Sequence, residues 1–188
     1  RNITFSIPSG NFGHAYAGWT AKEMGLPIEK LLIATNTNDV LHQTFSTNNY
    51  AKTNVVQTLA PSMDISVASN FERLLYNLYD DDSSLLAKNM RSFPERSIDI
   101  PEDKQELVSS FFKSYKSNDQ EILEQIHDTY SKTRYILDPH TATGVRASDI
   151  ISIDDPVITM GTAHPAKFTD AIEKAIPEYK AFIPAKVE

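Results

Sequence analysis

The segment that most constrains the fold is the opening stretch, residues 3–25. A β-branched and aromatic run, residues 3–7, leads into the glycine turn 8–13, which reads PSGNFG, and an alanine-containing stretch then runs to Gly25. This order predicts a strand, a tight turn and a helix. Glycine permits positive φ and close backbone approach, so successive N–H groups of such a turn can point into one concavity at the helix start.

A turn of this kind suits an anion, and phosphate is the expected ligand. The N–H groups and the macrodipole at a helix N-terminus favour a negative charge by about 0.3–1 kcal/mol. Ser9 and Asn11 add side-chain donors. The alternative is a strand-to-helix turn whose glycines only relieve strain, and the loop alone does not decide between the two.

Composition narrows the class of protein. The 188 residues are 40% hydrophobic and 23% charged, which is ordinary for a globular chain with its own core. The net charge of −7 argues against a nucleic-acid or anionic-membrane partner, because both need a basic face. The chain has no cysteine, which excludes disulfides, a thiolate nucleophile and thiolate metal ligands.

No run of 18 apolar residues and no signal-peptide pattern occurs in the sequence. We therefore expect no membrane span and a cytoplasmic location. Arg1 and Asn2 lead directly into a strand without a starting methionine. On this ground we expect the chain to be the later part of a longer protein.

Hydrophobic patterns along the chain predict alternating strands and helices. The expected strands are residues 3–7, 30–34, 55–59, 135–137 and 156–160. Helices are expected after Gly13, after Asn38 or Asp39, from Ser69 or Asn70, from Pro101 through Tyr115 and after Asn118. Two further helices are expected over residues 145–150 and 170–176.

These elements predict an α/β fold with an open, mainly parallel sheet, flanking helices and an α-helical insertion. Residues 1–82 are expected to form an α/β part with the phosphate-binding turn, residues 83–133 the insertion, and residues 134–188 an α/β return of the same domain. In a parallel sheet, the glycine turn and the polar loops 138–144 and 161–168 would meet at one edge, where ligands of such sheets bind.

Several polar residues are better explained by structure than by chemistry. The run Asp80, Asp81 and Asp82 is typical of a solvated turn and helix cap, so we expect no metal site. His127 lies close to an apolar stripe without a ligand partner other than acids, which favours a structural or surface role.

In five ordered motifs the chain resembles the carboxyl-terminal half of the threonine synthase family, which belongs to the fold type II pyridoxal-phosphate-dependent enzymes. The motifs are IPSGNFG, ATNTNDVLH, APSMDISVASNFERLLY, LDPHTATG and TMGTAHPAKF. The match covers most of the chain and weakens only in the expected insertion.

The resemblance implies a lyase that converts O-phospho-L-homoserine and water to L-threonine and phosphate, with pyridoxal phosphate as cofactor and no metal. It places Thr162 beside the pyridine nitrogen, and His140, Thr141 and His164 near the substrate. It also assigns the cofactor phosphate to the glycine loop, namely Ser9, Gly10, Asn11, Phe12 and Gly13.

The resemblance also implies an absence. The family's Schiff-base lysine belongs to an earlier segment, and Lys167 stands in the wrong motif to replace it. We therefore expect no catalytic residue in this chain, a missing amino-terminal part as its partner, and no activity of the chain alone.

Two other functions remain open at this stage. A threonine-synthase-like phospholyase would share the cofactor site but eliminate phosphate without adding water. A non-enzymatic phosphate-binding module would use the glycine loop alone.

Overall fold

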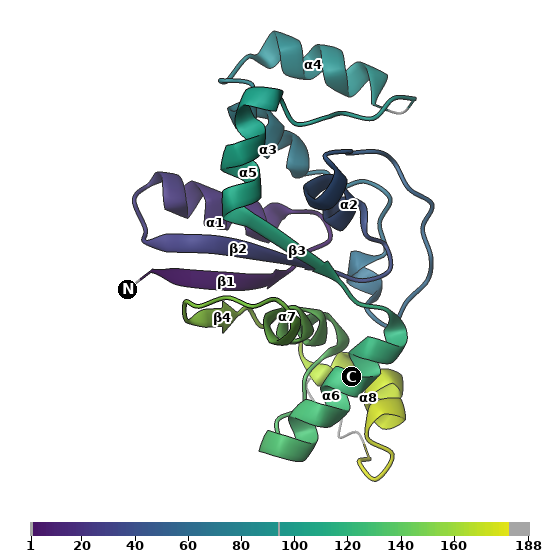
Figure 1. Cartoon of the computed structure of the whole chain (residues 1–188). Helices are drawn as coiled ribbons and strands as arrows, with labels where there is room; N and C mark the ends of the chain where they lie inside the picture. Colours follow the sequence, from purple (N-terminus) through teal and green to yellow (C-terminus); the bar gives the residue numbers. More distant parts are fainter. Residues whose placement is uncertain (1, 94, 181–188) are drawn as a thin grey trace.

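The computed structural model describes residues 2–93 and 95–180, and a four-stranded parallel sheet forms its centre (Figure 1). The strand order is β3-β2-β1-β4. Phe5 of β1 pairs with Leu31 of β2 and with Ile158 of β4, and Leu31 pairs in turn with Phe112 of β3. The strands are β1 (Ile3–Pro8), β2 (Ile28–Thr35), β3 (Phe112–Lys116) and β4 (Val157–Thr159).

Eight helices and three short 3-10 turns surround the sheet in the described part of the chain. The helices are α1 (Gly13–Glu23), α2 (Val40–Thr47), α3 (Phe71–Leu78), α4 (Ser83–Ser92), α5 (Gln105–Phe111), α6 (Asp119–Thr133), α7 (Pro139–Ile150) and α8 (Thr169–Ala175). The turns are η1 (Pro61–Met63), η2 (Glu102–Lys104) and η3 (Pro165–Lys167).

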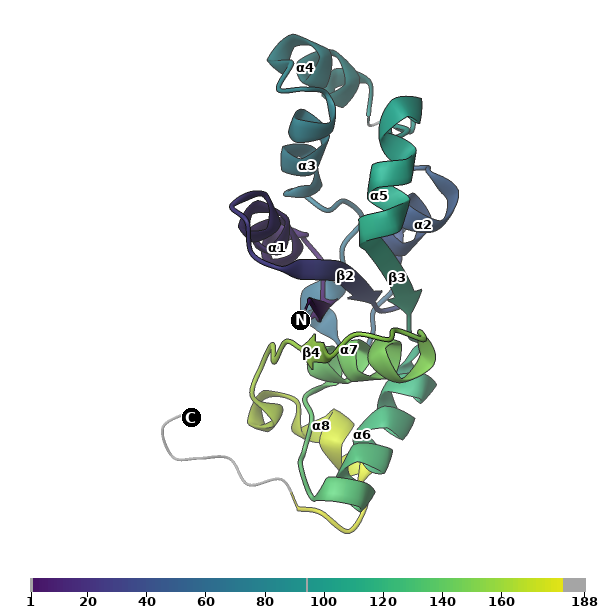
Figure 2. The same cartoon turned by 60° about the vertical axis from the view of Figure 1, so that its left-hand side comes forward.

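The helices lie in layers on the two faces of the sheet. In both views α1, α3 and α5 lie on one side, whereas α7, backed by α6 and α8, lies on the other (Figures 1 and 2). Side chains of β2 alternate accordingly: Leu31 and Ile33 join the core under α1, and Leu32 and Ala34 pack with Ala147 of α7. Both faces of the sheet are therefore buried, as expected for parallel strands.

The core on the α1 side is rich in aromatic rings. Phe12 packs edge-on against Phe71 with ring centroids 5.2 Å apart, and Phe45 stacks on Phe112 at 4.8 Å. Trp19 packs against the same Phe112. Because Phe12 directly precedes α1, this aromatic cluster holds the start of that helix in place.

Several sequence-based predictions are confirmed. The opening strand–helix–strand unit is β1, α1 and β2 with parallel pairing. The predicted stripe of α3 is fully buried at Phe71, Leu74, Leu75 and Leu78. Asn118 caps α6 in a capping box with Glu121, and Asp82 caps α4.

Other predictions are wrong, and each error has a physical reason. The helix expected from Pro101 through Tyr115 ends at Phe111, because the chain turns into β3 and pairs with β2. The expected insertion, residues 83–133, therefore carries one strand of the central sheet. Residues 55–59 and 135–137 form no regular strand.

The loop expected at residues 138–144 is instead the first half of α7. Pro139 stands at the first helical position and Asp138 caps the helix through the N–H groups of His140 and Thr141. Both features start helices, so the motif contained a helix signal that the strand-then-loop interpretation missed. No helix in the described residues is long and apolar enough to cross a membrane.

Candidate functional site

The glycine loop lies at the carboxyl end of β1, where the chain turns into α1. Ser9 N–H donates to the carbonyl of Ala34 at 2.8 Å, which holds the loop beside the end of β2. Phe12 precedes the helix with a φ of 65°. A Cβ on Gly10 would lie 3.2 Å from Met63 Cα and from Ser62 O, so only glycine lets η1 approach the loop this closely.

The loop presents hydrogen-bond donors that nothing else in the described chain uses. The backbone N–H groups of residues 10–14 donate to no other described group. Ser9 is 4% exposed, and its buried hydroxyl has no partner among the residues that the structure describes. Helix α1 has no side-chain cap and no acidic residue in its first turn. Free N–H groups, an unpaired hydroxyl and an uncompensated positive helix end fit an anion such as phosphate.

The side chains of the loop play different parts. The ring of Phe12 is 1% exposed and lies in the aromatic core, so this residue offers a ligand only its backbone. The carbonyl of Asn11 accepts from Asn70 N–H at 3.0 Å, and Asn11 Oδ1 accepts from Ser69 N–H at 3.4 Å. The start of α3 therefore holds the loop on its outer side.

The segment after β4 runs beside β1, the strand that leads into this loop. Met160 N–H donates to the carbonyl of Ser6 on β1, and the exposed Thr162 donates its N–H to Thr141 Oγ1 at 2.9 Å. Among residues 2–93 and 95–180, the one partner of Thr162 Oγ1 is the carbonyl of Met160, at a long 3.4 Å. The Thr162 hydroxyl therefore keeps most of its hydrogen-bonding capacity at the same edge of the sheet.

Helix α7 also packs at this edge of the sheet. A Cβ on Gly144 would lie 3.0 Å from Thr159 Cγ2 and 3.1 Å from the ring of Pro8, so α7 packs on β1 and β4 without a spacer. The Ser6 hydroxyl donates to the carbonyl of Gly144 at 2.7 Å. The glycine turn, the start of α7 and the segment after β4 thus meet at one edge.

The polar groups at the start of α7 are paired with one another. Asp138 accepts from His140 N–H at 2.9 Å, from His140 Nδ1 at 3.0 Å and from the Thr141 hydroxyl. His140 Nε2 accepts from Ser62 N–H at 3.2 Å, which assigns the ring proton to Nδ1. Burial disfavours the charged carboxylate, but hydrogen bonds from His140 and Thr141 outweigh burial and hold the pKa of Asp138 below its ordinary value.

This pairing bears on the residues expected near a substrate. His140 and Thr141 are buried, and both ring nitrogens of His140 are engaged within the chain. His164 is exposed and caps η3 by accepting from Ala166 N–H at 3.2 Å. Substrate contact by these three residues stays a prediction.

The polar residues after β2 form a network that the sequence analysis did not assign. Asn36 is fully buried and bonds to Asp64 at 2.7 Å, 28 positions away. Asp39 precedes α2 as expected but makes no cap bond with its side chain, which pairs with Lys116 at 2.9 Å instead. The available signal was the polar cluster directly after a buried strand, but single asparagines there are typical of turns.

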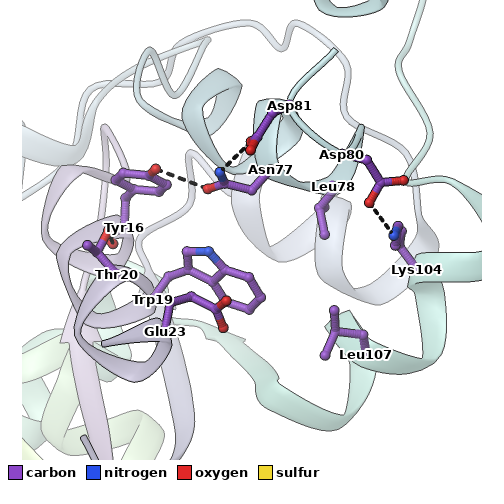
Figure 3. Close-up of a pocket in the computed structure, with 10 residues that line it drawn as sticks. All are labelled: Tyr16, Trp19, Thr20, Glu23, Asn77, Leu78, Asp80, Asp81, Lys104 and Leu107. Carbon is purple, nitrogen blue, oxygen red and sulfur yellow. Dashed lines mark hydrogen bonds and ion pairs between the residues drawn. The ribbon is translucent and has the colours of Figure 1, made fainter. Parts of the chain in front are cut away.

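A hollow of about 560 Å³ lies apart from this edge, between α1, α3 and α5 (Figure 3). Its polar side chains largely pair among themselves: Tyr16 Oη donates to Asn77 Oδ1 at 3.0 Å, and Lys104 Nζ lies 2.7 Å from Asp80 Oδ1. None of the predicted site residues lines it. In residues 2–93 and 95–180, no three acidic or histidine side chains gather to hold a metal ion.

Comparison with known proteins identifies relatives of the chain. Residues 141–188 match the family model described as threonine synthase, C-terminal. A threonine synthase of Pseudomonas aeruginosa is 42% identical over 93% of this chain, which spans 38% of that relative. The chain therefore covers about two fifths of the length of the curated relatives it matches.

Solved structures agree with this result. The PLP-bound threonine synthase from Brucella melitensis superimposes with a TM-score of 0.92 and 40% identity, over 100% of this chain and 40% of that one. A yeast threonine synthase gives a TM-score of 0.89 and 35% identity, over 99% of this chain and 42% of that one.

The parallel sheet with a glycine loop at its carboxyl edge is thus part of the fold type II core of pyridoxal-phosphate-dependent enzymes. Within that class, residues 141–188 carry the threonine synthase C-terminal domain, and the chain corresponds to a carboxyl-terminal part of the threonine synthases that it matches.

Proposed function

We propose that this chain supplies the cofactor-phosphate site of a threonine synthase, which converts O-phospho-L-homoserine and water to L-threonine and phosphate with pyridoxal phosphate. The observation that carries the proposal is the set of unused donors at the start of α1, together with the buried, unpaired hydroxyl of Ser9. The similarity to the PLP-bound threonine synthase of Brucella melitensis supports the choice of ligand.

The residues of the loop would have different roles in binding the phosphate. The N–H groups of residues 10–14 and the Ser9 hydroxyl would hold the phosphate, while the buried ring of Phe12 keeps the loop in place. Gly10 lets the backbone of η1 close the loop from one side. This arrangement needs no cationic side chain, because the helix end itself carries positive potential.

Thr162 would face the pyridine nitrogen with its hydroxyl. When bound, pyridoxal phosphate accepts negative charge that develops on the substrate carbon. A neutral hydroxyl, unlike a carboxylate, does not hold the ring nitrogen protonated, so Thr162 would leave that charge less delocalised onto the ring. The hydrogen bond from Thr162 N–H to Thr141 holds the backbone at this position, which supports the proposal.

The overall reaction removes phosphate from the γ-carbon of the substrate and adds water at the β-carbon. The lysine that binds the cofactor covalently in the family is not assigned to any residue of this chain. We therefore propose that activity requires the amino-terminal part found in the longer relatives, and that the chain alone is inactive.

The test is a product analysis on protein expressed from the complete reading frame, with pyridoxal phosphate and O-phospho-L-homoserine. Equal amounts of threonine and inorganic phosphate would support the proposal. Phosphate together with a keto acid would identify a phospholyase instead. Tight cofactor binding without turnover would favour a non-enzymatic module, and a reaction lacking pyridoxal phosphate serves as the control.

A further inference from the structure

Four polar residues form a closed hydrogen-bonded network, here called the Asp64 clamp: Asn36, Asn38, Thr58 and Asp64. Asp64 Oδ1 accepts from Asn36 Nδ2 at 2.7 Å, from Asn38 Nδ2 at 2.9 Å and from the Thr58 hydroxyl at 2.6 Å. Its other oxygen accepts from Thr58 N–H at 2.9 Å. The carboxylate is thus satisfied by neutral donors alone.

The clamp ties an extended segment to the end of β2. The segment between α2 and η1 has no regular structure over residues 51–58. Asn38 pairs with both backbone groups of Val56, at 2.7 and 2.8 Å, and Asn36 Nδ2 reaches the carbonyl of Ala60 at 3.2 Å. These bonds replace the strand pairing that this segment lacks.

The held segment leads directly to the wall of the glycine loop. Ser62 and Met63 form the backbone that lies 3.2 Å from a Cβ position on Gly10. Ser62 N–H is also bonded to His140, and Leu59 N–H is bonded to Asp119 at 3.1 Å. The wall is therefore attached to β2, α6 and α7, and the clamp supplies the attachment to β2.

We propose that the Asp64 clamp is a positioning device for cofactor binding: it holds η1 against Gly10 and so keeps the donors of the glycine loop in the geometry that binds phosphate. This inference rests on the proposed function. In this proposal, Asn36, Asn38, Thr58 and Asp64 act through the wall and not by contact with the cofactor.

The wall and the loop tolerate little displacement relative to one another. The wall lies so close to Gly10 that a Cβ added there would need a shift of a few tenths of an ångström. A displacement of η1 would therefore change the packing that holds the loop. A network of several mutually satisfied hydrogen bonds holds a segment in one geometry, whereas removal of one member leaves its partners unpaired.

The experiment replaces one hydroxyl of the clamp in protein expressed from the complete reading frame. Thr58→Val keeps the shape of the side chain but removes the group that bonds to Asn36, Asp64 and Ala60 N–H. Thr58→Ser retains the hydroxyl and serves as the rescue variant. Asn54→Ala is the matched control, because Asn54 is exposed on the same segment and makes no hydrogen bond within the described residues.

Two measurements decide the outcome: the dissociation constant for pyridoxal phosphate and the ³¹P chemical shift of the bound phosphate. Loss of one hydrogen-bonding group predicts binding weaker by about tenfold in Thr58→Val, with a changed ³¹P shift. Thr58→Ser and Asn54→Ala are expected to match the wild type in both.

The results separate this inference from the proposed function. A wild-type protein that binds no pyridoxal phosphate would overturn both. A wild type that binds it, with Thr58→Val indistinguishable from Asn54→Ala in affinity and ³¹P shift, would overturn the clamp alone. An equal loss in Thr58→Val and Thr58→Ser would also count against it, because the hydroxyl would then not be the cause.

Discussion

Helices α1 and α7 begin at the same edge of the sheet, but their first turns are completed in opposite ways. Asp138 caps α7, and its carboxylate accepts from His140, from Thr141 and from Ala163 N–H. Helix α1 has neither a side-chain cap nor an acid in its first turn. One helix end is satisfied by the chain itself, and the other keeps its donors available.

This difference indicates that the N-terminus of α7 is structural and that the N-terminus of α1 is suited to a ligand. A capped N-terminus stabilises the fold but offers an anion nothing. An uncapped one forgoes that stabilisation, and here the loop is held instead by the buried ring of Phe12 and by the backbone of η1.

Removing the cap of α7 should cost the most. Asp138→Ala leaves the buried Nδ1–H of His140 and the hydroxyl proton of Thr141 without acceptors and uncaps the helix, so we expect a loss of about 3 kcal/mol in the free energy of unfolding. Chemical denaturation monitored by circular dichroism measures it. Asp154→Ala, at an exposed aspartate, is the control and should change little. An equal effect of the two substitutions would contradict a structural role for the α7 cap.

Lowering the pH should also destabilise the start of α7, but by less than Asp138→Ala does. The folded pKa of Asp138 lies below its reference value of 3.8, so its stabilisation is fully present above that pH and is lost as the pH falls through the folded pKa. We expect the free energy of unfolding to decrease below about pH 4 and this part of the decrease to vanish in Asp138→Asn. Identical pH profiles for the two proteins would refute the assignment.

Adding a methyl group to the loop before α1 should weaken ligand binding rather than destabilise the fold. Gly10→Ala places a methyl group 3.2 Å from the backbone of η1, which must shift to accommodate it. We expect pyridoxal phosphate to bind about tenfold more weakly, equivalent to about 1.4 kcal/mol. Gly161→Ala is the matched control, because a Cβ there meets nothing within 4 Å. Unchanged affinity in Gly10→Ala would show that the loop tolerates displacement.

The smallest effect should come from giving α1 the negative charge that its first turn lacks. His14→Glu puts an acid at the exposed second position of the helix, which should stabilise the free protein by about 0.3–1 kcal/mol and weaken phosphate binding. Ala17→Glu, exposed on the same helix beyond its first turn, should do neither. Thermal unfolding without cofactor and titration with pyridoxal phosphate report the two changes. Opposite signs in the two measurements are the distinguishing result.

Much of the fold was predictable where the signal was local. The glycine turn between β1 and α1, the stripe of α3 and the capping box of Asn118 with Glu121 all depend on residues a few positions apart. For the candidate site, the sequence indicated the loop and Thr162, but the buried placement of Phe12 and the pairing of His140 with Ser62 depend on contacts across the molecule.

By itself, the sequence determined the strand–turn–helix opening, most helix starts and the family resemblance, because caps and periodic stripes act within one or two turns of the chain. Only the tertiary structure decided that the chain leaves its helix at Phe112, since that strand obtains its hydrogen bonds from β2, far away in sequence. It likewise decided that Asn36 donates a hydrogen bond to Asp64, 28 positions away. Hydrogen bonds between distant segments depend on which surfaces pack together, and local patterns do not specify that.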